Sequence, residues 1–403
     1  MSPMYRLTNT VRPYAWGSTT AIPELLGTEP TGEPQAEIWM GAHPGAPSRV
    51  TRDDEQVPLN EVIAADPAAA LGATTADRFG PRLPFLLKVL AAGAPLSLQV
   101  HPDLVQAKAG FADEEARGIP IDAAYRNYKD ANHKPEMIVA LVPFDGLCGF
   151  RRPTEAADLI EALGVDSLKP YVDILRARPE DAALRETLAA VLTADPESMA
   201  ATVTEAVEAA TPLATAPGPY ADSYAAYVSI AQSYPGDPGV IAAMLLNYVR
   251  LQPGEALYLG AGIPHAYLNG LGVEIMANSD NVLRCGLTPK HVDVPELLRI
   301  VRFESGDPGI LRPAASPEGE ELYDTPIDEF RLSRYALTPG DTPRVLDDRT
   351  PQILLCPQGS ALLRSTTAGT ELTLPRGGSA FVPAGERVEV AGEGTLFRAT
   401  VVA

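Results

Sequence analysis

The sequence predicts a mainly β protein with an α-helical insertion, organised as two related β modules and one helical domain. Three observations support this fold class. Short apolar runs separated by Gly and Pro fill residues 5–150 and 250–403, a pattern typical of strands and tight turns. Residues 153–249 are instead rich in Ala and repeat a helical period. One strand-and-turn pattern occurs twice, starting at Gly254 and at Gly377.

Composition limits the size and the partners of the protein. A chain of 403 residues exceeds one ordinary hydrophobic core, so two or three domains are expected. The formal net charge of -20 argues against nucleic acid or an anionic membrane as the main partner. The three cysteines, Cys148, Cys285 and Cys356, fit no disulfide framework. Without an apolar signal core, a membrane-length run or a heptad repeat, we expect a cytoplasmic monomer.

The N-terminal segment contains both tryptophans, in YAWG at residues 14–17 and in AEIWMGAHPGAPS at residues 36–48. A Trp beside Gly is usually part of a core, but Trp16 is also a candidate for stacking on a substrate. His43 lies in a GAHPG turn, where a bond to the backbone is at least as good an interpretation as a role in a site. A short helix is predicted around Leu59–Ala65.

The apolar run LPFLLKVL at residues 83–90 encloses Lys88. An isolated buried charge is strongly unfavourable, so Lys88 must be paired, face a cavity, or extend along the strand to solvent. The following SLQVHP alternates strictly, which places Ser97, Gln99 and His101 on one strand face. Because apolar runs flank this strand, we favour a polar cavity lining over a solvated edge.

Residues 103–130 are predicted to form an exposed helix, and the segment after it is rich in ionisable groups. His133, Lys134 and Glu136 stand just before an apolar strand, and their density favours a site there. The Ala-rich insertion that begins near Pro153 is predicted to contain four to six helices. It has neither His nor Cys, so we expect no chemistry in it.

The internal repeat relates GEALYLGAGIPH, from Gly254, to GGSAFVPAGERV, from Gly377. Each copy is a Gly-led turn, an alternating strand, a turn of small residues and a new strand. His265 of the first copy aligns with Val388 of the second, and no histidine follows His291 in the chain. We therefore expect two β-barrel-like modules, of which the C-terminal one binds no metal.

Residues 259–290 concentrate polar groups among glycines and short apolar pieces. His265 follows a Pro that restricts the backbone, at the start of a strand, which suits an imidazole aimed inward at a metal. Glu274, the NSDN run that contains Asp280, and Arg284 follow within twenty residues of it.

Four residues are candidate metal ligands: Gln99, His101, Glu136 and His265. Two imidazoles, a carboxylate and an amide oxygen suit a borderline ion such as Zn²⁺. Gln is an unusual ligand, and the spacing alone is equally compatible with two ordinary buried histidines.

Several strings in the right order resemble the type I mannose-6-phosphate isomerases (phosphomannose isomerases). They are QVHPD (99–103), HKPEM (133–137), GIPHAY (262–267) and VEIMANSDNVLRCGLTPKH (273–291), with LPFLLKVL and AEIWMGAHP in addition. The resemblance is strong over residues 5–150 and 240–303, and elsewhere it rests on organisation alone. It implies two cupin-type jelly rolls plus a helical domain.

The domain boundaries expected on this basis divide the chain into three parts. They are residues 1–152 with 246–320 for the catalytic cupin-type domain, 153–245 for the helical insertion, and 321–403 for a metal-free cupin-like domain.

The resemblance also implies site residues. Gln99, His101, Glu136 and His265 match the family's four zinc ligands, with one Zn²⁺ per chain. Arg284 matches the family's active-site arginine. Lys134 and Asp280 match positions discussed as acid/base residues, and Glu274 lines the same site.

The implied reaction is an aldose–ketose exchange in carbohydrate metabolism, between mannose 6-phosphate and fructose 6-phosphate through an enediol. It needs a base near C1 and C2, for which Lys134, Asp280 and Glu274 are alternatives. Arg284 would stabilise the developing oxyanion or hold the substrate. Candidate substrate contacts are Lys88, Ser97 and Trp16, the first two for the phosphate.

Other interpretations stay open from the sequence. An iron oxygenase of the cupin class normally has an HxH ligand pair, which is QxH here. A non-catalytic sugar-binding cupin would not need Lys134, Asp280 and Arg284 together. An isomerase of another aldose phosphate would keep the same groups. The sequence shows no nucleotide-binding Gly-rich loop followed by Lys, so no coupled nucleotidylyltransferase is expected.

Overall fold

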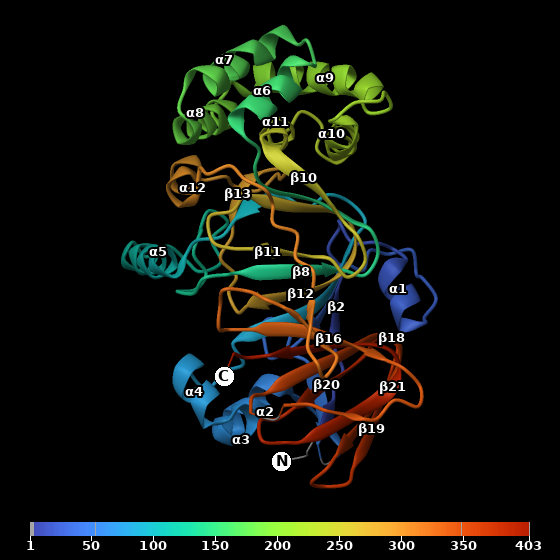
Figure 1. Cartoon of the computed structure of the whole chain (residues 1–403). Coiled ribbons are helices and arrows are strands. Elements are labelled where there is room, and N and C mark those ends of the chain that lie inside the picture. Colours follow the sequence, from blue (N-terminus) through green and yellow to red (C-terminus); the bar gives the residue numbers. More distant parts are fainter. Residues whose placement is uncertain (1–3, 53, 348, 403) are drawn as a thin grey trace.

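The computed structural model describes residues 4–402 except 53 and 348. The chain forms three parts that follow one another along the long axis of the molecule: a helical part, a central β part and a C-terminal β part (Figure 1). The central part is built from segments on both sides of the helical insertion in the sequence. The prediction of a mainly β fold with an α-helical insertion is confirmed.

The central part is a ten-stranded antiparallel sheet with the order β10-β9-β12-β6-β3-β2, to which β7, β8, β11 and β13 add side pairings. The bounds are β2 (Thr10–Arg12), β3 (Glu37–Met40), β6 (Phe85–Ala92), β7 (Leu98–Val100), β8 (Glu136–Ala140), β9 (Phe144–Phe150), β10 (Leu246–Leu251), β11 (Ala256–Leu259), β12 (His265–Ala277) and β13 (Leu283–Gly286). The long strand β12 organises this sheet. Its first residue pairs with β7 and β9, and its second half pairs with β6 and β8.

The change of partners along β12 takes place at Gly270. This residue has φ 131°, in the region that favours glycine. A Cβ there would lie 2.7 Å from the Phe144 ring, so only glycine fits. His265 before this point and Glu274 after it therefore lie on one strand that connects both sets of partners.

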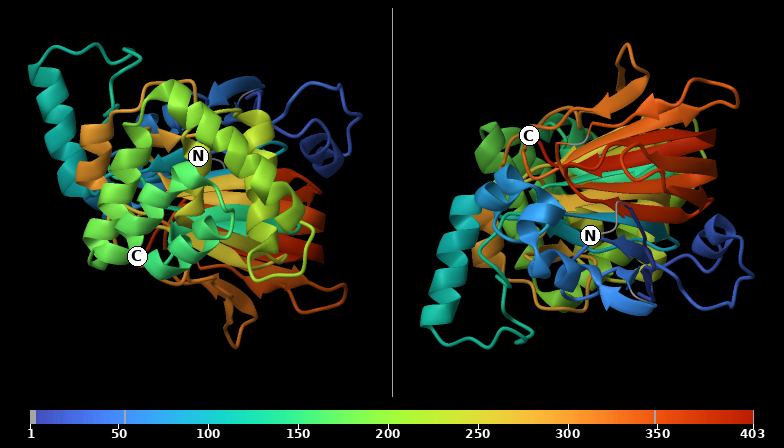
Figure 2. Two further views of the ribbon diagram at one scale, coloured as in Figure 1. Left: turned by 90° about the horizontal axis from the view of Figure 1, so that it is seen from above. Right: turned by 90° about the horizontal axis from the view of Figure 1, so that it is seen from below.

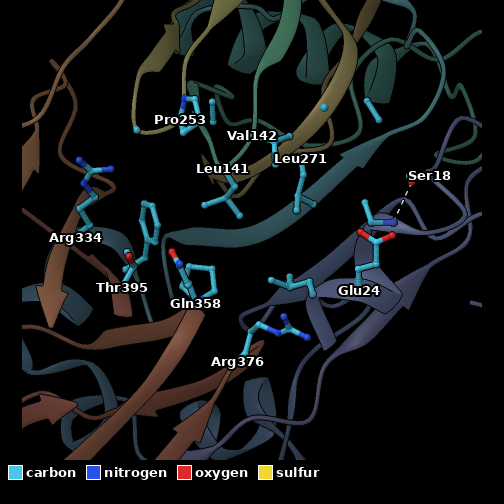
Figure 3. A pocket seen from close by; sticks show the side chains of 18 of the residues that line it. Ser18, Glu24, Leu141, Val142, Pro253, Leu271, Arg334, Gln358, Arg376 and Thr395 are labelled. Carbon is cyan, nitrogen blue, oxygen red and sulfur yellow. Dashed lines mark hydrogen bonds between the residues drawn. The ribbon is translucent and has the colours of Figure 1, made fainter. Parts of the chain in front are cut away.

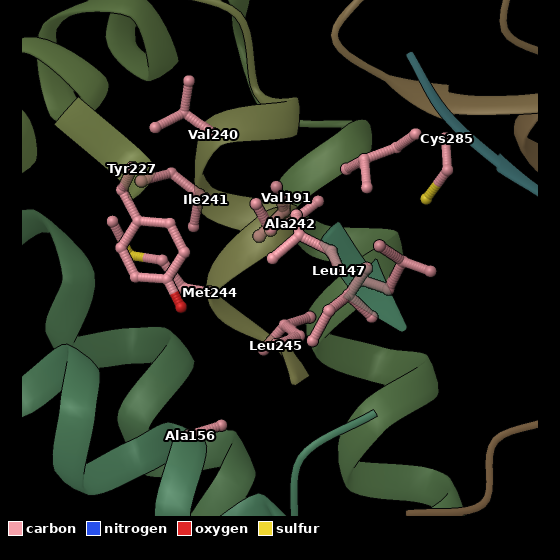
Figure 4. Packing of buried hydrophobic residues seen from close by; sticks show 14 of the residues in the cluster. Leu147, Ala156, Val191, Tyr227, Val240, Ile241, Ala242, Met244, Leu245 and Cys285 are labelled. Carbon is pink, nitrogen blue, oxygen red and sulfur yellow. The ribbon is translucent and has the colours of Figure 1, made fainter. Parts of the chain in front are cut away.

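The insertion contains six α-helices, α6 (Pro153–Glu161), α7 (Lys169–Ala177), α8 (Glu180–Leu192), α9 (Pro196–Leu213), α10 (Ala221–Ser233) and α11 (Gly239–Met244), with a 3₁₀ turn at Asp166–Leu168. The short helix α11 is wholly buried and lies at the centre of the packing (Figure 4). Its side chains pack in one hydrophobic cluster with Leu147 of β9 and Leu283 of β13. The helices and the central sheet therefore share one core.

The C-terminal part is a nine-stranded antiparallel sheet with the order β1-β20-β18-β21-β16-β15-β14, plus β17 and β19. The bounds are β1 (Tyr5–Arg6), β14 (Ala314–Ala315), β15 (Glu320–Tyr323), β16 (Arg331–Leu337), β17 (Arg344–Val345), β18 (Gln352–Ser365), β19 (Glu371–Pro375), β20 (Gly378–Val382) and β21 (Val388–Thr400). The start of the chain thus pairs with a C-terminal strand. A second hydrophobic cluster joins this sheet to the central one, with Phe381 and Leu87 among its members.

The predicted internal repeat is confirmed by the backbone. Gly254 and Gly377 both have positive φ, at 88° and 79°. Short strands, β11 and β20, follow the two turns, and the next strands, β12 and β21, are each 13 residues long. They begin at His265 and Val388, the two positions that the sequence alignment pairs.

The remaining elements lie around the two sheets. They are α1 (Ala21–Leu26), the hairpin β4 (Arg49–Arg52) and β5 (Glu55–Pro58), α2 (Leu59–Ala65), α3 (Pro67–Leu71), α4 (Ala73–Phe79), α5 (Leu104–Ala116) and α12 (Val294–Ile300). Helix α2 has the predicted bounds. Among the described residues, no helix combines the length and the apolar character needed to cross a bilayer.

The prediction of one helix over residues 103–130 is wrong in its second half. Helix α5 starts at a capping box between Asp103 and Gln106 and ends at Ala116. Gly118 then has φ 67°, which stops the helix, and Pro120 follows. In the two end views α5 lies at the edge of the molecule (Figure 2). The residues after it run back to the central sheet as turns.

Candidate active site

Three of the predicted metal ligands meet inside the central part. The donor atoms of His101, Glu136 and His265 all lie within 4.8 Å of one another. Nε2 of His101 and Nε2 of His265 are each 3.4 Å from the same oxygen, Oε2 of Glu136. The three residues are 0%, 2% and 0% exposed, respectively. The sequence placed them up to 164 positions apart, and the β12 pairings bring them together.

Two atoms of this cluster have no hydrogen-bond partner among the described residues, Nε2 of His101 and Oε2 of Glu136. Buried polar atoms in proteins are nearly always bonded, so two orphaned atoms that face each other need an explanation. Two imidazoles and one carboxylate are a donor set that zinc prefers. A divalent cation between these atoms would satisfy both, and the residues present therefore fit such an ion.

The outer nitrogen of each ring is held by a backbone carbonyl. Nδ1 of His101 lies 2.8 Å from the Asn281 carbonyl, and Nδ1 of His265 lies 2.9 Å from the Ile263 carbonyl. A carbonyl only accepts, so each Nδ1–H donates, and each ring then presents its Nε2 to Glu136. This arrangement orients metal-binding histidines. Burial, opposed by Glu136, lowers the pKa of His101 to about 4, so the ring is neutral.

Glu136 is the charged member of the cluster. Its burial raises its pKa, but Lys134 and His101 outweigh that effect and hold the pKa of Glu136 well below its usual range. Lys134 Nζ is 3.3 Å from Oε1 of Glu136, the carboxylate oxygen that faces away from the two histidines. Lys134 therefore lies beside the candidate metal position, two residues before β8 begins.

Gln99 borders the cluster on the β7 side. It pairs with His265 across the strands, and its Nε2 lies 3.4 Å from Nε2 of His265. Turning the amide by half a revolution exchanges its nitrogen and oxygen, which would aim the oxygen at the cluster. Its neighbours Leu98 and Val100 are fully buried on the opposite face, as the alternation in SLQVHP predicts.

Lys88 is paired, as its place in an apolar run required. Its Nζ is 3.1 Å from Glu274 and 3.5 Å from Glu37. Burial opposes its charge, but these two carboxylates outweigh burial and raise the pKa of Lys88. Glu274 also accepts a bond of 3.0 Å from the Tyr267 hydroxyl. Glu37 accepts one of 2.6 Å from Trp39 Nε1.

Asp280 is linked to His43, whose role the sequence left open between a turn and a site. The Gly45 N–H donates to Nδ1 of His43, so the other ring nitrogen carries the proton. That nitrogen lies 3.2 Å from Asp280. The contact with His43, opposed by burial, lowers the pKa of Asp280. His43 thus has both the turn contact and a contact with a candidate acid/base residue.

Arg284 lies on β13 directly opposite Gln99. Its half-buried position lowers the pKa of its guanidinium. No hydrogen bond or ion pair joins the guanidinium of Arg284 to another residue in the part of the chain that the structure describes. A guanidinium without a partner beside the candidate metal cluster can bind an anionic ligand.

Two other predicted substrate contacts, Ser97 and Trp16, are partly buried. Trp16 packs against a cluster that includes Tyr267 and stacks on Tyr14 with ring centroids 5.7 Å apart. Ser97 directly precedes β7. Both stay predictions.

The sequence reasoning missed three residues of this region. Glu37 forms a second ion pair with Lys88, and the Tyr267 hydroxyl donates a hydrogen bond to Glu274. The Asn281 amide donates to the Asp130 carbonyl, in the loop before Lys134. A signal existed only for Glu37, since a lysine in an apolar run requires a carboxylate partner and AEIWMGAHP offers one.

A separate cavity of about 680 Å³ lies between the central and C-terminal sheets (Figure 3). Leu141, Val142 and Leu271 line one side of it, and Arg334 and Arg376 line the other. None of the candidate metal ligands borders this cavity. It is therefore distinct from the cluster described above.

The two-sheet architecture and the buried His–Glu–His cluster define a metal-binding protein of the cupin class. The family described as "Phosphomannose isomerase type I, catalytic domain" matches residues 4–153. A mannose-6-phosphate isomerase from Escherichia coli is 42% identical over 399 residues, which cover 98% of this chain and 99% of that protein. One from Homo sapiens is 33% identical over 413 residues, with 96% and 95% covered.

Solved structures agree with the sequence comparison. A mannose 6-phosphate isomerase from Salmonella typhimurium, solved with its substrate fructose 6-phosphate and zinc, has a TM-score of 0.90 and 39% identity. A variant of phosphomannose isomerase from the same organism has a TM-score of 0.92 and 40% identity. Both comparisons cover 100% of each chain. The chain belongs to the type I phosphomannose isomerase family, as the sequence resemblance implied.

Proposed function

We propose that this protein is a zinc-dependent isomerase that interconverts mannose 6-phosphate and fructose 6-phosphate. The observation that carries the proposal is the buried cluster of His101, Glu136 and His265, with its two orphaned donor atoms. Its members match the zinc ligands that the sequence resemblance implied. Gln99 completes the proposed ligand set. Relatives that span the whole chain are named mannose-6-phosphate isomerases, and one was solved with zinc and fructose 6-phosphate.

The reaction moves one proton between C2 and C1 of the open-chain sugar through an enediol, and a second proton between O2 and O1. Bound zinc would supply positive charge that polarises the sugar oxygens or orients the hydroxyls. His101, Glu136, His265 and Gln99 would hold it. The chain itself must bind the phosphate, keep water out and provide a base within reach of the two carbons.

Lys134 is the base we favour among the three candidates. Its Nζ lies beside the candidate metal position, 3.3 Å from Oε1 of Glu136. Asp280 has a lowered pKa, which makes it a weaker base near neutral pH. Both oxygens of Glu274 already have partners, Lys88 and Tyr267. Single-turnover rates of Lys134→Met, Asp280→Asn and Glu274→Gln would rank the three.

Arg284 would stabilise the oxyanion of the enediol or hold the phosphate, since its guanidinium has no described partner. Lys88 and Ser97 stay candidates for phosphate contacts, and Trp16 for packing on the substrate. The two carboxylates that neutralise Lys88 make it the weaker of the two cationic candidates for the phosphate.

The test is a coupled assay of mannose 6-phosphate conversion to fructose 6-phosphate on the purified protein, after chelation, and after zinc is restored. Activity that is lost and then regained supports both the reaction and the metal. Bound zinc without activity would instead favour an isomerase of another aldose phosphate. A protein with neither metal nor activity would support the sugar-binding alternative.

The domain division stays part of this proposal. Residues 1–152 with 246–320 would form the catalytic unit, 153–245 the helical insertion and 321–403 the metal-free unit. Pairing of β1 with β20 adds the first strand of the chain to the third unit. We also propose a cytoplasmic monomer without nucleic-acid or membrane partners, which light scattering and cell fractionation would test.

A further inference from the structure

We propose that Asn281 is a positioning residue that fixes both the metal-binding ring of His101 and the loop that carries Lys134. The inference rests on the proposed function for its catalytic consequence, but its effect on metal binding stands on geometry alone. Asn281 is fully buried and lies in the stretch that contains Asp280 and Arg284. Its side chain bonds to the stretch that leads to Lys134 and Glu136. The sequence contained it in the NSDN run without assigning it a role.

The first contact is with a metal ligand. The backbone carbonyl of Asn281 lies 2.8 Å from Nδ1 of His101 and accepts a hydrogen bond from its N–H. This bond selects the ring tautomer and the ring direction, and it leaves Nε2 aimed at Glu136. The side-chain bonds of Asn281 fix its backbone, and the backbone sets the position of this carbonyl.

The side-chain amide of Asn281 is bonded at both ends to a single loop. Its Oδ1 accepts from the N–H of Lys129 at 2.7 Å and from the N–H of Asp130 at 3.2 Å. Its Nδ2 donates to the carbonyls of Asp130 and Asn132, at 2.8 and 2.9 Å. Nδ2 also lies 3.3 Å from the Asp130 carboxylate. One amide thus replaces the regular backbone pairing that this turn-rich segment lacks.

Three further hydrogen bonds connect residues 278–280 with residues 130–132. The Asp280 N–H donates to the Asp130 carboxylate at 2.8 Å, and the Ser279 hydroxyl donates to the Asn132 carbonyl at 3.1 Å. The Asn132 amide donates to the Asn278 carbonyl at 3.0 Å. None of these residues makes as many contacts with the opposite segment as Asn281. The segment of residues 129–132 leads directly to Lys134 and Glu136.

The consequence is a chain of rigid contacts from Asn281 to the site. Fixing residues 129–132 places Lys134 beside Glu136, and fixing the Asn281 carbonyl places His101. Asp280 is the residue before Asn281, and Arg284 is three residues after it. A small displacement of Asn281 would therefore move a ligand and candidate catalytic groups together, and such displacements are costly to both affinity and rate.

The experiment compares two variants at this position. Asn281→Ala removes all side-chain bonds. Asn281→Asp keeps the shape and the acceptor, but it removes the donors and places a charge beside Asp130. Zinc affinity is measured by competition with a chromophoric chelator, unfolding of the metal-free protein by calorimetry, and kcat and KM at saturating zinc.

The matched control is Asn247→Ala. The Asn247 amide also bridges several carbonyls, those of Cys148, Gly149, Phe150 and Gly306, and none of these four residues is a candidate ligand or part of residues 129–132. Its loss should lower stability without a specific effect on the metal.

For both Asn281 variants we expect zinc affinity to fall about 10- to 100-fold and kcat at saturating zinc to fall at least about tenfold. Asn247→Ala should keep both within about twofold at a similar loss of thermal stability. Zinc affinity and kcat that stay near wild type in folded Asn281 variants would overturn the proposal. An equal loss of zinc affinity in Asn247→Ala would do the same, as would failure of both Asn281 variants to fold, because the residue would then serve the fold rather than the site.

These outcomes separate the two proposals. If the wild-type protein binds zinc but does not isomerise mannose 6-phosphate, the proposed function fails, while the zinc-affinity comparison still decides the role of Asn281.

Discussion

At the scale of single residues, the buried charges of the site are neutralised by different kinds of partner. Lys88 is compensated by Glu37 and Glu274, whereas Glu136 faces two imidazoles and one lysine. The oxygen of Glu136 that points to the imidazoles has no donor among the described residues. A cation is the partner that this position lacks, and a metal-ligand variant should therefore lose the metal before it loses the fold.

His265→Ala tests the ligand assignment. The substitution removes one donor from the candidate zinc position, and zinc affinity should fall by more than about 100-fold, with activity lost in parallel. Inductively coupled plasma analysis of the dialysed protein measures the metal content. His291→Ala, an exposed histidine outside the cluster, is the control and should retain full zinc. Stoichiometric zinc in His265→Ala would contradict the assignment, and Gln99→Ala extends the test to the fourth ligand.

Arg284→Ala separates turnover from metal binding. The guanidinium has no described partner to lose, so the fold and the zinc content should be unchanged. Loss of a positioned cation at developing negative charge should lower kcat about 10²- to 10³-fold. Steady-state kinetics and metal analysis measure the two effects. The control is Arg302→Ala, an exposed arginine, and a near-normal kcat in Arg284→Ala would remove Arg284 from the site.

Lys88→Met tests the buried charge pairs and has a defined pH dependence. The free energy of unfolding should fall by about 3–5 kcal/mol at pH 8, because Glu274 and Glu37 then lose their shared cation. Burial already raises the pKa of Glu274, and without Lys88 it should rise further. A carboxyl whose folded pKa is raised contributes stability at low pH that is lost as the pH rises through that pKa.

The deficit of Lys88→Met should therefore be larger at pH 8 than at pH 5 in urea titrations. Lys88→Met combined with Glu274→Gln should recover part of the loss. A deficit that does not change with pH would show that Glu274 does not take up a proton in the variant.

At the scale of elements, sequence periodicity predicted most of what the structure contains. The helical period marked the insertion, strict alternation marked β7, and the repeat marked the first residues of β12 and β21. The end of α5 was missed because polar residues continue after Ala116, and only Gly118 and Pro120 mark the end of the helix. The pairing of β1 with β20 was missed since contacts between chain ends leave no periodic signal. Asn281 was missed because its contacts with residues 129–132, about 150 positions away, leave no periodic signal either.

Val388→His tests whether the repeat is structural or a latent metal site. Val388 is fully buried in the apolar core of the C-terminal sheet, opposite Ser365. A polar ring there would lie in a mainly aliphatic cluster, so zinc should stay at one per chain while the free energy of unfolding falls by about 1–3 kcal/mol. Val390→His, in the same core, should lose a similar amount. A second bound zinc in Val388→His alone would show that the C-terminal module can hold a metal.

At the scale of the whole molecule, the three parts are joined by shared cores rather than by linkers. One hydrophobic cluster runs from the helices into β7, β9 and β13, and another runs from the central sheet into the C-terminal sheet. The sequence predicted the helical part from its period and the two β parts from the repeat. It did not predict how the parts pack on one another, because apolar side chains at the borders look like any other core residues. The shared cores predict that the metal-binding strands and the C-terminal sheet unfold together.

Phe381→Ala tests this coupling. Phe381 of β20 is fully buried in the cluster that also contains Leu87 and Val89 of β6, so its truncation should cost about 3–5 kcal/mol. In calorimetry we expect one transition at lower temperature, and removal of zinc should shift that same transition further down, since a ligand stabilises only the unit that unfolds with its site. Leu372→Ala, at the partly exposed edge of the other C-terminal cluster, should shift the transition much less. Two separate transitions, of which zinc moves only one, would mean that the metal-binding sheet folds without the C-terminal sheet, and the C-terminal module would then be an attachment rather than a support of the site.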